Sequence, residues 1–243
     1  MIWRSSEYSH KGHYRHENED AVYSDVRSGI WCVADGMGGH QQGKLASQLL
    51  VNTVASLPAN RSLTLRVEAL ERKLFALNEI LQEKAQKLSV ERRGQKQTIG
   101  CTFVILLSDG VNCTCLWAGD SRLYLLRAGN LYQISDDHTL VNDLLTRGVI
   151  TQEQSENHPQ AHVVTRALGA SAEINFDKKT FQLQADDRYL LCSDGLHNEL
   201  EAQDISQALA ALTSSHCCRV LVDKVLQGSA RDNLTACVTG VYK

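Results

Sequence analysis

One stretch of the sequence decides the fold: Ile30-Trp31-Cys32-Val33-Ala34-Asp35-Gly36-Met37-Gly38-Gly39. It begins with an apolar run, as expected for a buried strand. The Asp35-Gly36 pair that follows is, taken alone, usually a turn, because Asp bonds its own backbone and Gly accepts a positive φ. Two similar apolar runs, Cys113–Trp117 and Arg188–Cys192, also end shortly before an Asp. We therefore expect several carboxylates to be held at strand ends, on rigid supports.

Five short stretches that are acidic or suited to phosphate binding occur along the chain. They are Arg15-His16-Glu17-Asn18-Glu19-Asp20, Asp35-Gly36-Met37-Gly38-Gly39, Ala118-Gly119-Asp120-Ser121-Arg122, Ser193-Asp194-Gly195 and Asp232-Asn233. Their carboxylates are spread over the whole length of the chain, so they can meet only by folding. Crowded carboxylates raise each other's pKa, and such a cluster stays ionised at neutral pH only if cations are bound within it. Oxygen ligands alone favour Mg²⁺ or Mn²⁺.

The composition is that of a globular protein. The chain has 243 residues, of which 43% are hydrophobic and 22% charged, and its net charge is -3. This length leaves one or two domains open, but no linker rich in Pro, Ser or Gly divides the chain. The charge offers no broad basic surface for nucleic acid. Because no segment approaches the ~20 apolar residues of a membrane span and the first residues lack a secretion signal, we expect a cytoplasmic protein without membrane insertion.

Eight cysteines could suggest metal binding or disulfides. However, no CxxC pair occurs, and Cys113-x-Cys115 and Cys217-Cys218 do not have the spacing of a zinc site. Most of the cysteines lie in apolar, strand-like runs, where thiols behave as small hydrophobic side chains. We therefore predict that they belong to the core.

Two amphipathic helices are predicted in the first part of the chain. Apolar residues recur at steps of three and four from Leu45 to Leu57, and again from Val67 to Leu88. Pro58 should end the first helix, and Ser62 can cap the second. The polar segment 90–97 is predicted to be a surface loop.

The remainder of the chain alternates between short strands and short helices. Turns that contain glycine separate the first four strands and predict sequential hairpins. The predicted strands are Cys101–Leu107, Val111–Ala118, Leu123–Arg127, Leu131–Ile134, Thr180–Leu183, Tyr189–Cys192 and Leu234–Tyr242, and the predicted helices are His138–Gly148, Thr151–His158, about Asp204–Leu212 and His216–Leu226. Pairs of helices between blocks of antiparallel strands favour an α+β fold. We predict a four-layer α-β-β-α sandwich, in which two mainly antiparallel sheets are flanked by pairs of helices.

The motifs, in this order and spacing, resemble the metal-dependent serine/threonine protein phosphatases of type 2C. Further matches to the bacterial branch are Gly12-x-x-Arg15, Gly43-x-x-Ala46-Ser47, Gly100-Cys101-Thr102, Asp137-His138-Thr139, Thr165-Arg166-Ala167-Leu168-Gly169 and Asp232-Asn233-Leu234-Thr235. One such tripeptide would be weak, but the ordered set is specific. The resemblance covers nearly the whole chain and implies a single catalytic domain over residues 1–243 that hydrolyses phosphoserine and phosphothreonine in proteins.

The resemblance also implies a centre of two Mn²⁺ or Mg²⁺ ions, and it assigns the ligands residue by residue. Asp35 would bridge the ions, Asp194 and Asp232 would bind one, the Gly36 carbonyl would bind the other, and Glu19 and Asp20 would ligate directly or through water. Such a centre acidifies a water and clamps the phosphate. In the family, the position of Asp120 helps to hold a third, looser ion together with that of Asp194, although Asp120 could instead cap a hairpin turn.

Arg15 is the motif-embedded cation nearest these acids in the sequence. Its planar guanidinium can hold two phosphate oxygens at once, so we assign Arg15 to the substrate phosphate. The alternative is an ordinary surface arginine.

One departure from the family affects the expected mechanism. Many eukaryotic relatives have a His after the Asp-Gly of the second motif, proposed to protonate the leaving oxygen, whereas Met37 cannot transfer a proton. The proton would have to come from elsewhere, with metal-bound water as one alternative. His40 and His138 are further candidate general acids, although a lone His more often makes a structural hydrogen bond or faces solvent. The segment of about 138–166 resembles the flap beside the catalytic centre of bacterial members, and His162 occupies a position where Asn is common. Substrate choice through the flap is therefore an open question.

Two other classes of function are weighed against an active phosphatase. A non-catalytic phosphopeptide-binding module of the same fold would be marked by the loss of metal-binding acids, and none is missing. A different two-metal hydrolase such as a nuclease predicts a basic groove, which is not evident. The opening residues also resemble phosphatases encoded beside type VI secretion systems, which oppose a partner kinase, and a housekeeping partner of another bacterial kinase remains an alternative. The expected partners are thus a phosphoprotein and its Ser/Thr kinase, and we expect a monomer.

Overall fold

The computed structural model describes residues 2–39, 41–59, 62–92, 95, 97–156, 158–211 and 213–242. Its strands form two five-stranded sheets. The first sheet consists of β1 (Ile2–His10), β10 (Leu234–Tyr242), β9 (Arg188–Cys192), β6 (Arg122–Arg127) and β7 (Asn130–Gln133), in that order. The second consists of β2 (Ala21–Asp25), β3 (Ile30–Met37), β4 (Gly100–Ser108), β5 (Asn112–Ala118) and β8 (Asp177–Gln182).

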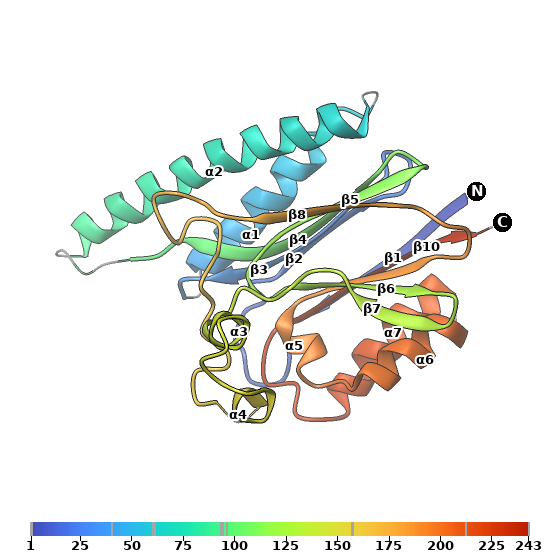
Figure 1. Ribbon diagram of the computed structural model, residues 1–243. Helices are drawn as coiled ribbons and strands as arrows, with labels where there is room; N and C mark the ends of the chain where they lie inside the picture. Colours follow the sequence, from blue (N-terminus) through green and yellow to red (C-terminus); the bar gives the residue numbers. More distant parts are fainter. Residues whose placement is uncertain are drawn as a thin grey trace.

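The helices cover the outer faces of the two sheets (Figure 1). Helices α1 (Gln41–Ala55) and α2 (Leu63–Glu91) pack on the second sheet, and α6 (Ala202–Ala211) and α7 (Ser214–Leu226) pack on the first. The shorter α3 (Leu140–Thr146), α4 (Gln152–Glu156) and α5 (Asp194–His197) lie at one end of the sandwich. Every pair of neighbouring strands in the two sheets is antiparallel. The predicted four-layer α-β-β-α architecture is confirmed.

Three buried clusters join these layers, and β3 contributes to two of them. Cys32 and Ala34 face the core beneath α1 and α2, whereas Trp31 and Val33 face the core between the sheets. Because both faces of β3 are covered, its sequence is a continuous apolar run instead of an alternating one. The strand nevertheless extends further than predicted, through Asp35-Gly36-Met37, and Asp35 pairs with Thr102 of β4. The carboxylate is therefore part of the sheet and not of a turn after it.

The long helix α2 agrees with its sequence pattern. The Ser62 side chain accepts a hydrogen bond from the Leu65 amide, as expected for a helix cap. The buried stripe Leu70, Leu74, Leu77 and Leu81 has the predicted helical spacing. The helix ends at Glu91, so the segment predicted as a loop begins later than residue 90, and Arg93, Gly94 and Lys96 lie outside the described residues.

Strand β1 was not predicted from the sequence. It pairs with β10 along its whole length, but none of its residues is fully buried, so it shows no apolar periodicity. Its main inward contact comes from Trp3, whose ring centroid lies 4.5 Å from that of Trp31. A strand at the edge of a sheet needs only partial burial, which leaves a weak sequence signal.

The predicted hairpin at Gly119-Asp120-Ser121 is wrong. Strands β5 and β6, on either side of these residues, belong to different sheets, so the chain crosses from one sheet to the other there. Gly119 has φ +103°, a conformation that favours glycine, and an added Cβ would lie 2.4 Å from the Thr102 side chain. The neighbouring turns, Asp109-Gly110 and Gly129-Asn130, do join paired strands.

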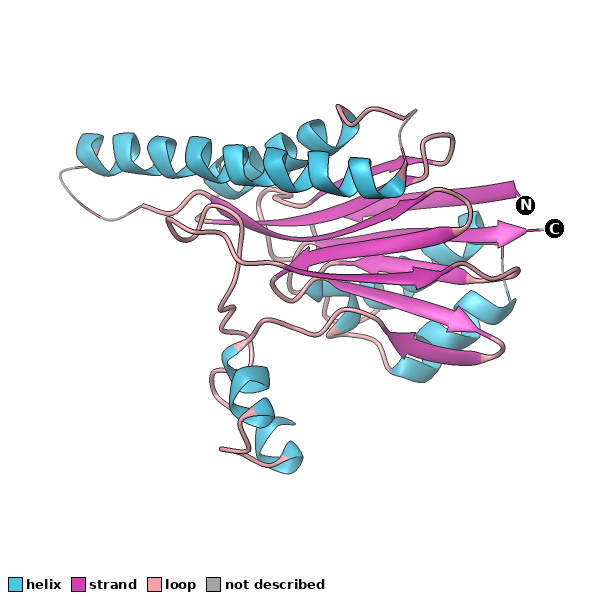
Figure 2. Cartoon of the chain, turned by 45° about the horizontal axis from the view of Figure 1, so that its top comes forward, coloured by secondary structure: helices cyan, strands magenta, loops and turns pink. Residues whose placement is uncertain are grey.

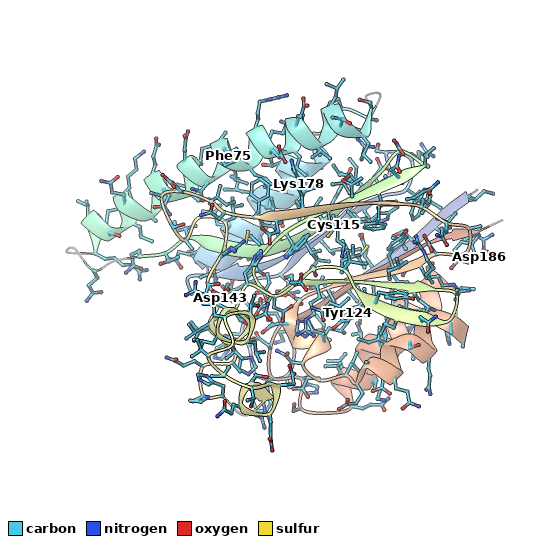
Figure 3. All side chains as sticks on the ribbon, viewed as in Figure 1. Phe75, Cys115, Tyr124, Asp143, Lys178 and Asp186 are labelled. Atoms are coloured by element: carbon cyan, nitrogen blue, oxygen red, sulfur yellow. The ribbon has the colours of Figure 1, made fainter. Side chains whose placement is uncertain are left out.

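All eight cysteines are free and buried, as predicted. Cys115, for example, lies in the core between the sheets (Figure 3). Burial raises the pKa of Cys113 to about 11, so that thiol is uncharged near neutral pH.

The segment of about 138–166 projects from one end of the sandwich and contains α3 and α4 (Figure 2). The Thr139 side chain caps α3 by accepting a hydrogen bond from the Asn142 amide. We call this segment the flap. Within the part of the chain that the structure describes, no helix combines the length and the apolar character needed to cross a membrane.

Candidate active site

The candidate site lies where the chain passes from one sheet to the other. Residues 11–20 connect β1 of the first sheet to β2 of the second, and residues 119–121 connect β5 of the second sheet to β6 of the first. Strand β9 ends and β10 begins at this same end, since Cys192 is paired with Ala236. The five motifs of the sequence thus meet at one edge of the sandwich.

A cavity of about 390 Å³ opens there, and five carboxylates are among the residues that line it. Of the predicted site residues, all except Asp20 line this cavity, which we call the carboxylate cavity. The predicted residues that line it are Arg15, Glu19, Asp35, Gly36, Asp120, Asp194 and Asp232. A second cavity of about 440 Å³ shares Asp120 and His162 with it and extends between the flap and α5.

Asp20 lies behind the cavity, where two hydroxyl groups hold its carboxylate. Its Oδ2 accepts hydrogen bonds from Ser193 Oγ at 2.8 Å and Thr235 Oγ1 at 2.7 Å. Its Oδ1 is buried without a hydrogen-bond partner among the described residues. Burial raises the pKa of Asp20 to about 7, against the lowering effect of the two hydroxyls. The sequence offered one signal for these partners, since Ser193 and Thr235 both belong to its motifs.

Asp35 and Asp194 face each other across the two sheets. Burial, together with the charges of Asp20 and Asp194, raises the pKa of Asp35 well above its usual range. Burial and the charge of Asp232 raise the pKa of Asp194, and a hydrogen bond with Asp35 opposes that increase. Two carboxyl groups that share a hydrogen bond favour a shared proton or a bound cation over two free negative charges.

Asp120 is the carboxylate contributed by the crossing between the sheets. It is 7% exposed, and burial, followed by the charge of Asp194, raises its pKa to about 7. Its backbone carbonyl accepts a hydrogen bond from His197 Nε2 at 3.0 Å. Because the turn is not a hairpin, the alternative of Asp120 as a hairpin cap is no longer open.

Arg15 pairs with Asp232 at the mouth of the cavity. The distance from Nη2 of Arg15 to Oδ2 of Asp232 is 2.6 Å, and both side chains are partly exposed. This hydrogen bond raises the pKa of Arg15. Arg15, which is predicted to bind the substrate phosphate, is thus paired in the structure with Asp232, which is predicted to bind a metal ion.

Close backbone packing surrounds Gly36. A Cβ atom there would lie 2.4 Å from the Gly43 backbone and 2.6 Å from the Glu19 carbonyl oxygen. A Cβ on Gly43 would lie 2.1 Å from Glu19 Oε2. Both positions therefore need glycine for space, and Gly43 explains why the start of α1 belongs to the motif set.

Asn233 holds the connection between the sheets in place. Its Oδ1 accepts a hydrogen bond from the Glu19 amide at 2.8 Å, and its Nδ2 donates to the carbonyls of Lys11 and Glu17. The residue after Asp232 thereby fixes the loop that contains Arg15 and Glu19.

The donor set fits divalent cations, although the side chains are not arranged as a preformed ligand cage. Across the described ranges, no three His, Cys, Asp or Glu side chains stand in positions to hold one metal ion. The unpartnered Oδ1 of Asp20 and the raised pKa values of Asp35, Asp120 and Asp194 nevertheless indicate carboxyls whose ionised form lacks a compensating positive charge among the described residues. Oxygen donors with this excess charge suit Mg²⁺ or Mn²⁺.

Comparison with known proteins gives the family. The family model described as Protein phosphatase 2C matches residues 9–227. This chain belongs to the protein phosphatase 2C family. The predicted resemblance is therefore confirmed.

Two relatives of this phosphatase 2C chain, PstP and PppA, illustrate the similarity. The serine/threonine protein phosphatase PstP of Mycobacterium tuberculosis is 34% identical over 241 residues; the match covers 99% of this chain but 45% of PstP, so the chain spans about half of that relative's length. The solved structure of PppA, a key regulatory component of T6SS in Pseudomonas aeruginosa, is 39% identical, with a TM-score of 0.88 and coverage of 98% and 97% of the two chains. The catalytic domain of PstP in complex with 2 manganese ions has a TM-score of 0.86 at 33% identity and covers 100% and 99%.

The structure of this phosphatase 2C chain describes one of the two histidines predicted as alternative general acids. His40 lies outside the described residues. His138 does not line the carboxylate cavity; it is buried, and its Nε2 lies 3.2 Å from Asp177 Oδ2, so it has a structural role in the flap base. His162, at a position where Asn is common in bacterial members, lines both cavities.

Proposed function

We propose that this chain is a metal-dependent protein phosphatase that hydrolyses phosphoserine and phosphothreonine at the carboxylate cavity. The observation that supports this proposal most strongly is that carboxylates from both sheets and from both connections between them line one cavity, with Arg15 at its mouth. A phosphomonoester needs neutralisation of its oxygens and a positioned water, and this arrangement can provide both.

Each residue has a proposed role in that reaction. Asp35 would bridge two cations, Asp194 and Asp232 would bind one, and Glu19, Asp20 and the Gly36 carbonyl would complete the ligands directly or through water. Asp120 would hold a third, looser ion together with Asp194. Bound Mn²⁺ or Mg²⁺ would supply charge neutralisation and a more acidic water.

Arg15 would bind two oxygens of the substrate phosphate. In the structure it is paired with Asp232, so substrate binding would exchange one anionic partner for another. The guanidinium keeps its charge in both states, because arginine is protonated near neutral pH with either partner, and the hydrogen bond to Asp232 raises the pKa of Arg15 further in the paired state. Release of Asp232 would also leave that carboxylate able to ligate a cation.

Hydrolysis of p-nitrophenyl phosphate and of a phosphothreonine peptide, each with Mn²⁺ or with EDTA, tests the proposal. We expect activity with Mn²⁺ and none with EDTA, and we expect Asp194→Asn to abolish it without unfolding the protein. Activity that survives chelation would contradict the metal mechanism. Metal-dependent binding of phosphopeptides without hydrolysis would favour the non-catalytic module instead.

The wider role also belongs to this proposal. We infer one catalytic domain over residues 1–243, a monomer, acting against a Ser/Thr kinase on a shared phosphoprotein. Eight free, buried thiols suit the reducing cytoplasm. Similarity to PppA supports a role in regulating type VI secretion, which deletion of the gene and measurement of phosphothreonine on secretion components would test.

A further inference from the structure

The carboxylate cavity contains an imidazole that has no assigned role. Among the histidines that the structure describes, only His162 lines this cavity. Its ring makes no hydrogen bond to any described residue. The rings of five others are each hydrogen-bonded within the fold: His10, His13, His138, His158 and His197. The His162 ring is therefore available to a ligand in the cavity.

The backbone after His162 is anchored to the base of the flap. Val164 forms an isolated bridge with Thr139, and the Leu140 amide donates to the Val163 carbonyl at 2.9 Å. The Thr165 amide donates to the His138 carbonyl at 2.8 Å. Val164 itself lines the carboxylate cavity. These contacts hold the backbone beside His162, which lines both cavities.

The charge around His162 suits an imidazolium. Asp120 lines both cavities with it, and Asp194 lines the carboxylate cavity. Burial and the charge of Asp232 raise the pKa of Asp194, whereas the proximity of His162 acts in the lowering direction. The imidazole is thus close enough to the reacting carboxylates to interact with them through charge.

The chemistry of the substrate requires a proton donor at this cavity. The oxygen of serine or threonine leaves as a strongly basic alkoxide unless it is protonated as the bond to phosphorus breaks. Met37 lines the cavity but has no proton to transfer, and the Arg15 guanidinium does not give up its proton. The carboxylates would be ionised with cations bound. Apart from the carboxyls, His162 is the one described side chain lining the cavity whose type commonly serves as a general acid, and no described residue occupies its ring.

We propose that His162 is the general acid that protonates the departing serine or threonine oxygen, an inference that rests on the phosphatase function proposed above. The water oxygen forms a bond to phosphorus, the bond from phosphorus to the side-chain oxygen breaks, and its electron pair goes to that oxygen. This oxygen takes the proton from the imidazolium. The attacking water releases a proton to solvent, and the neutral imidazole takes a proton from solvent. The imidazolium is thereby restored, and one water is consumed for each phosphate released.

Two substrates that differ in their leaving group test this role in His162→Gln. The p-nitrophenolate ion is stable and leaves without a proton, whereas a phosphothreonine peptide requires one. With Mn²⁺ present, we expect kcat on the peptide to fall by about 10²-fold, the usual contribution of general acid catalysis. We expect kcat on p-nitrophenyl phosphate to change by less than about 3-fold, since that reaction needs no general acid.

His158→Gln is the matched control, because His158 lies on the same flap but lines neither cavity. It should leave both substrates unaffected. Equal losses on both substrates in His162→Gln would overturn the proposal, since they would indicate a role in binding or flap position, and unchanged peptide hydrolysis would overturn it as well. A wild-type protein that hydrolyses neither substrate would instead refute the proposed function.

Discussion

The two walls of the carboxylate cavity differ in how they are built. One wall consists of Asp35, Asp194 and Asp232, which lie within or directly beside strands of the two sheets. The other consists of His162 and Val164, on a flap that contains two short helices and contributes no described residue to the three buried clusters. Packing fixes the first wall within the core, whereas a few backbone hydrogen bonds fix the second. We infer that the chemistry common to the family is placed on the rigid wall and the adjustable contacts on the other.

Asp35→Asn should have the largest effect and would test whether the rigid wall is essential. We expect kcat/KM on p-nitrophenyl phosphate to fall by on the order of 10³-fold or more, because the central carboxylate would no longer bind cations. The metal-free variant should be more stable than the wild type, since a carboxylate whose pKa is raised by its surroundings is replaced by a neutral amide. Calorimetry with EDTA measures this gain. Asp223→Asn on α7 is the control, and a lower midpoint for Asp35→Asn would contradict the electrostatic argument.

Arg15→Ala should have a smaller effect on the rate. If the guanidinium binds phosphate, KM should rise by about 10-fold, with a lesser fall in kcat as a contact to the transition state is lost. The exposed Arg72 on α2 provides a control, as Arg72→Ala should leave both constants unchanged. An unchanged KM in Arg15→Ala would remove the phosphate-binding assignment.

The pH dependence of the free energy of unfolding would test the buried carboxyls at the cavity. Burial raises the pKa values of Asp20 and Asp120 to about 7 in the folded protein, whereas unfolded carboxyls titrate near pH 4. Between about pH 4 and pH 7 the folded state therefore binds more protons than the unfolded state. The stability that Asp20 and Asp120 contribute is fully present below about pH 4 and is lost as the pH rises through about 7.

Thermal unfolding of the metal-free protein should reflect this loss. We expect these groups to lower the midpoint by about 5 °C between pH 5 and pH 7.5. Mn²⁺ should stabilise more at pH 7.5 than at pH 5, because protons compete with the metal at the lower pH. A stabilisation by Mn²⁺ that is independent of pH would show that these carboxyls are not its ligands.

Thr139→Val lies in the flap and should have the smallest effect on activity. Its side chain caps α3, so the variant should lose at most about 1 kcal/mol of unfolding free energy. We expect a rise in KM for phosphopeptides of about 2-fold, the shift that a change of well under 1 kcal/mol in binding produces. Thr213→Val is the matched control, since Thr213 precedes α7 without a side-chain cap bond. An equal loss of stability in both variants would show that α3 does not depend on this cap.

The sequence predicted the layers and the site residues better than it predicted the connections. The stripe from Leu70 to Leu81 and the cap at Ser62 are local signals, and the structure contains both. The carboxylates could be grouped because each lies in a short motif beside an apolar run. The sheet to which a strand belongs could not be predicted in this way, because pairing between distant residues leaves no local pattern.

The errors follow from that difference. The turn at Asp120 has the same residue types as a hairpin, yet β5 and β6 separate there. Strand β1 has no apolar periodicity because β10 supplies its pairing and no face of it is fully buried. The proximity of His162 to the carboxylates also depends on how the flap folds back, for which its sequence shows no local pattern.

The crossing at Gly119-Asp120-Ser121 has a mechanical consequence. Asp35 belongs to the second sheet, whereas Asp194 and Asp232 adjoin strands of the first, so any sliding of one sheet over the other would pull these carboxylates apart. Trp31 and Tyr189, which fill the interlayer core, would resist such shear from well outside the cavity. Under the proposed function, the catalytic rate would therefore depend on the alignment of the two sheets.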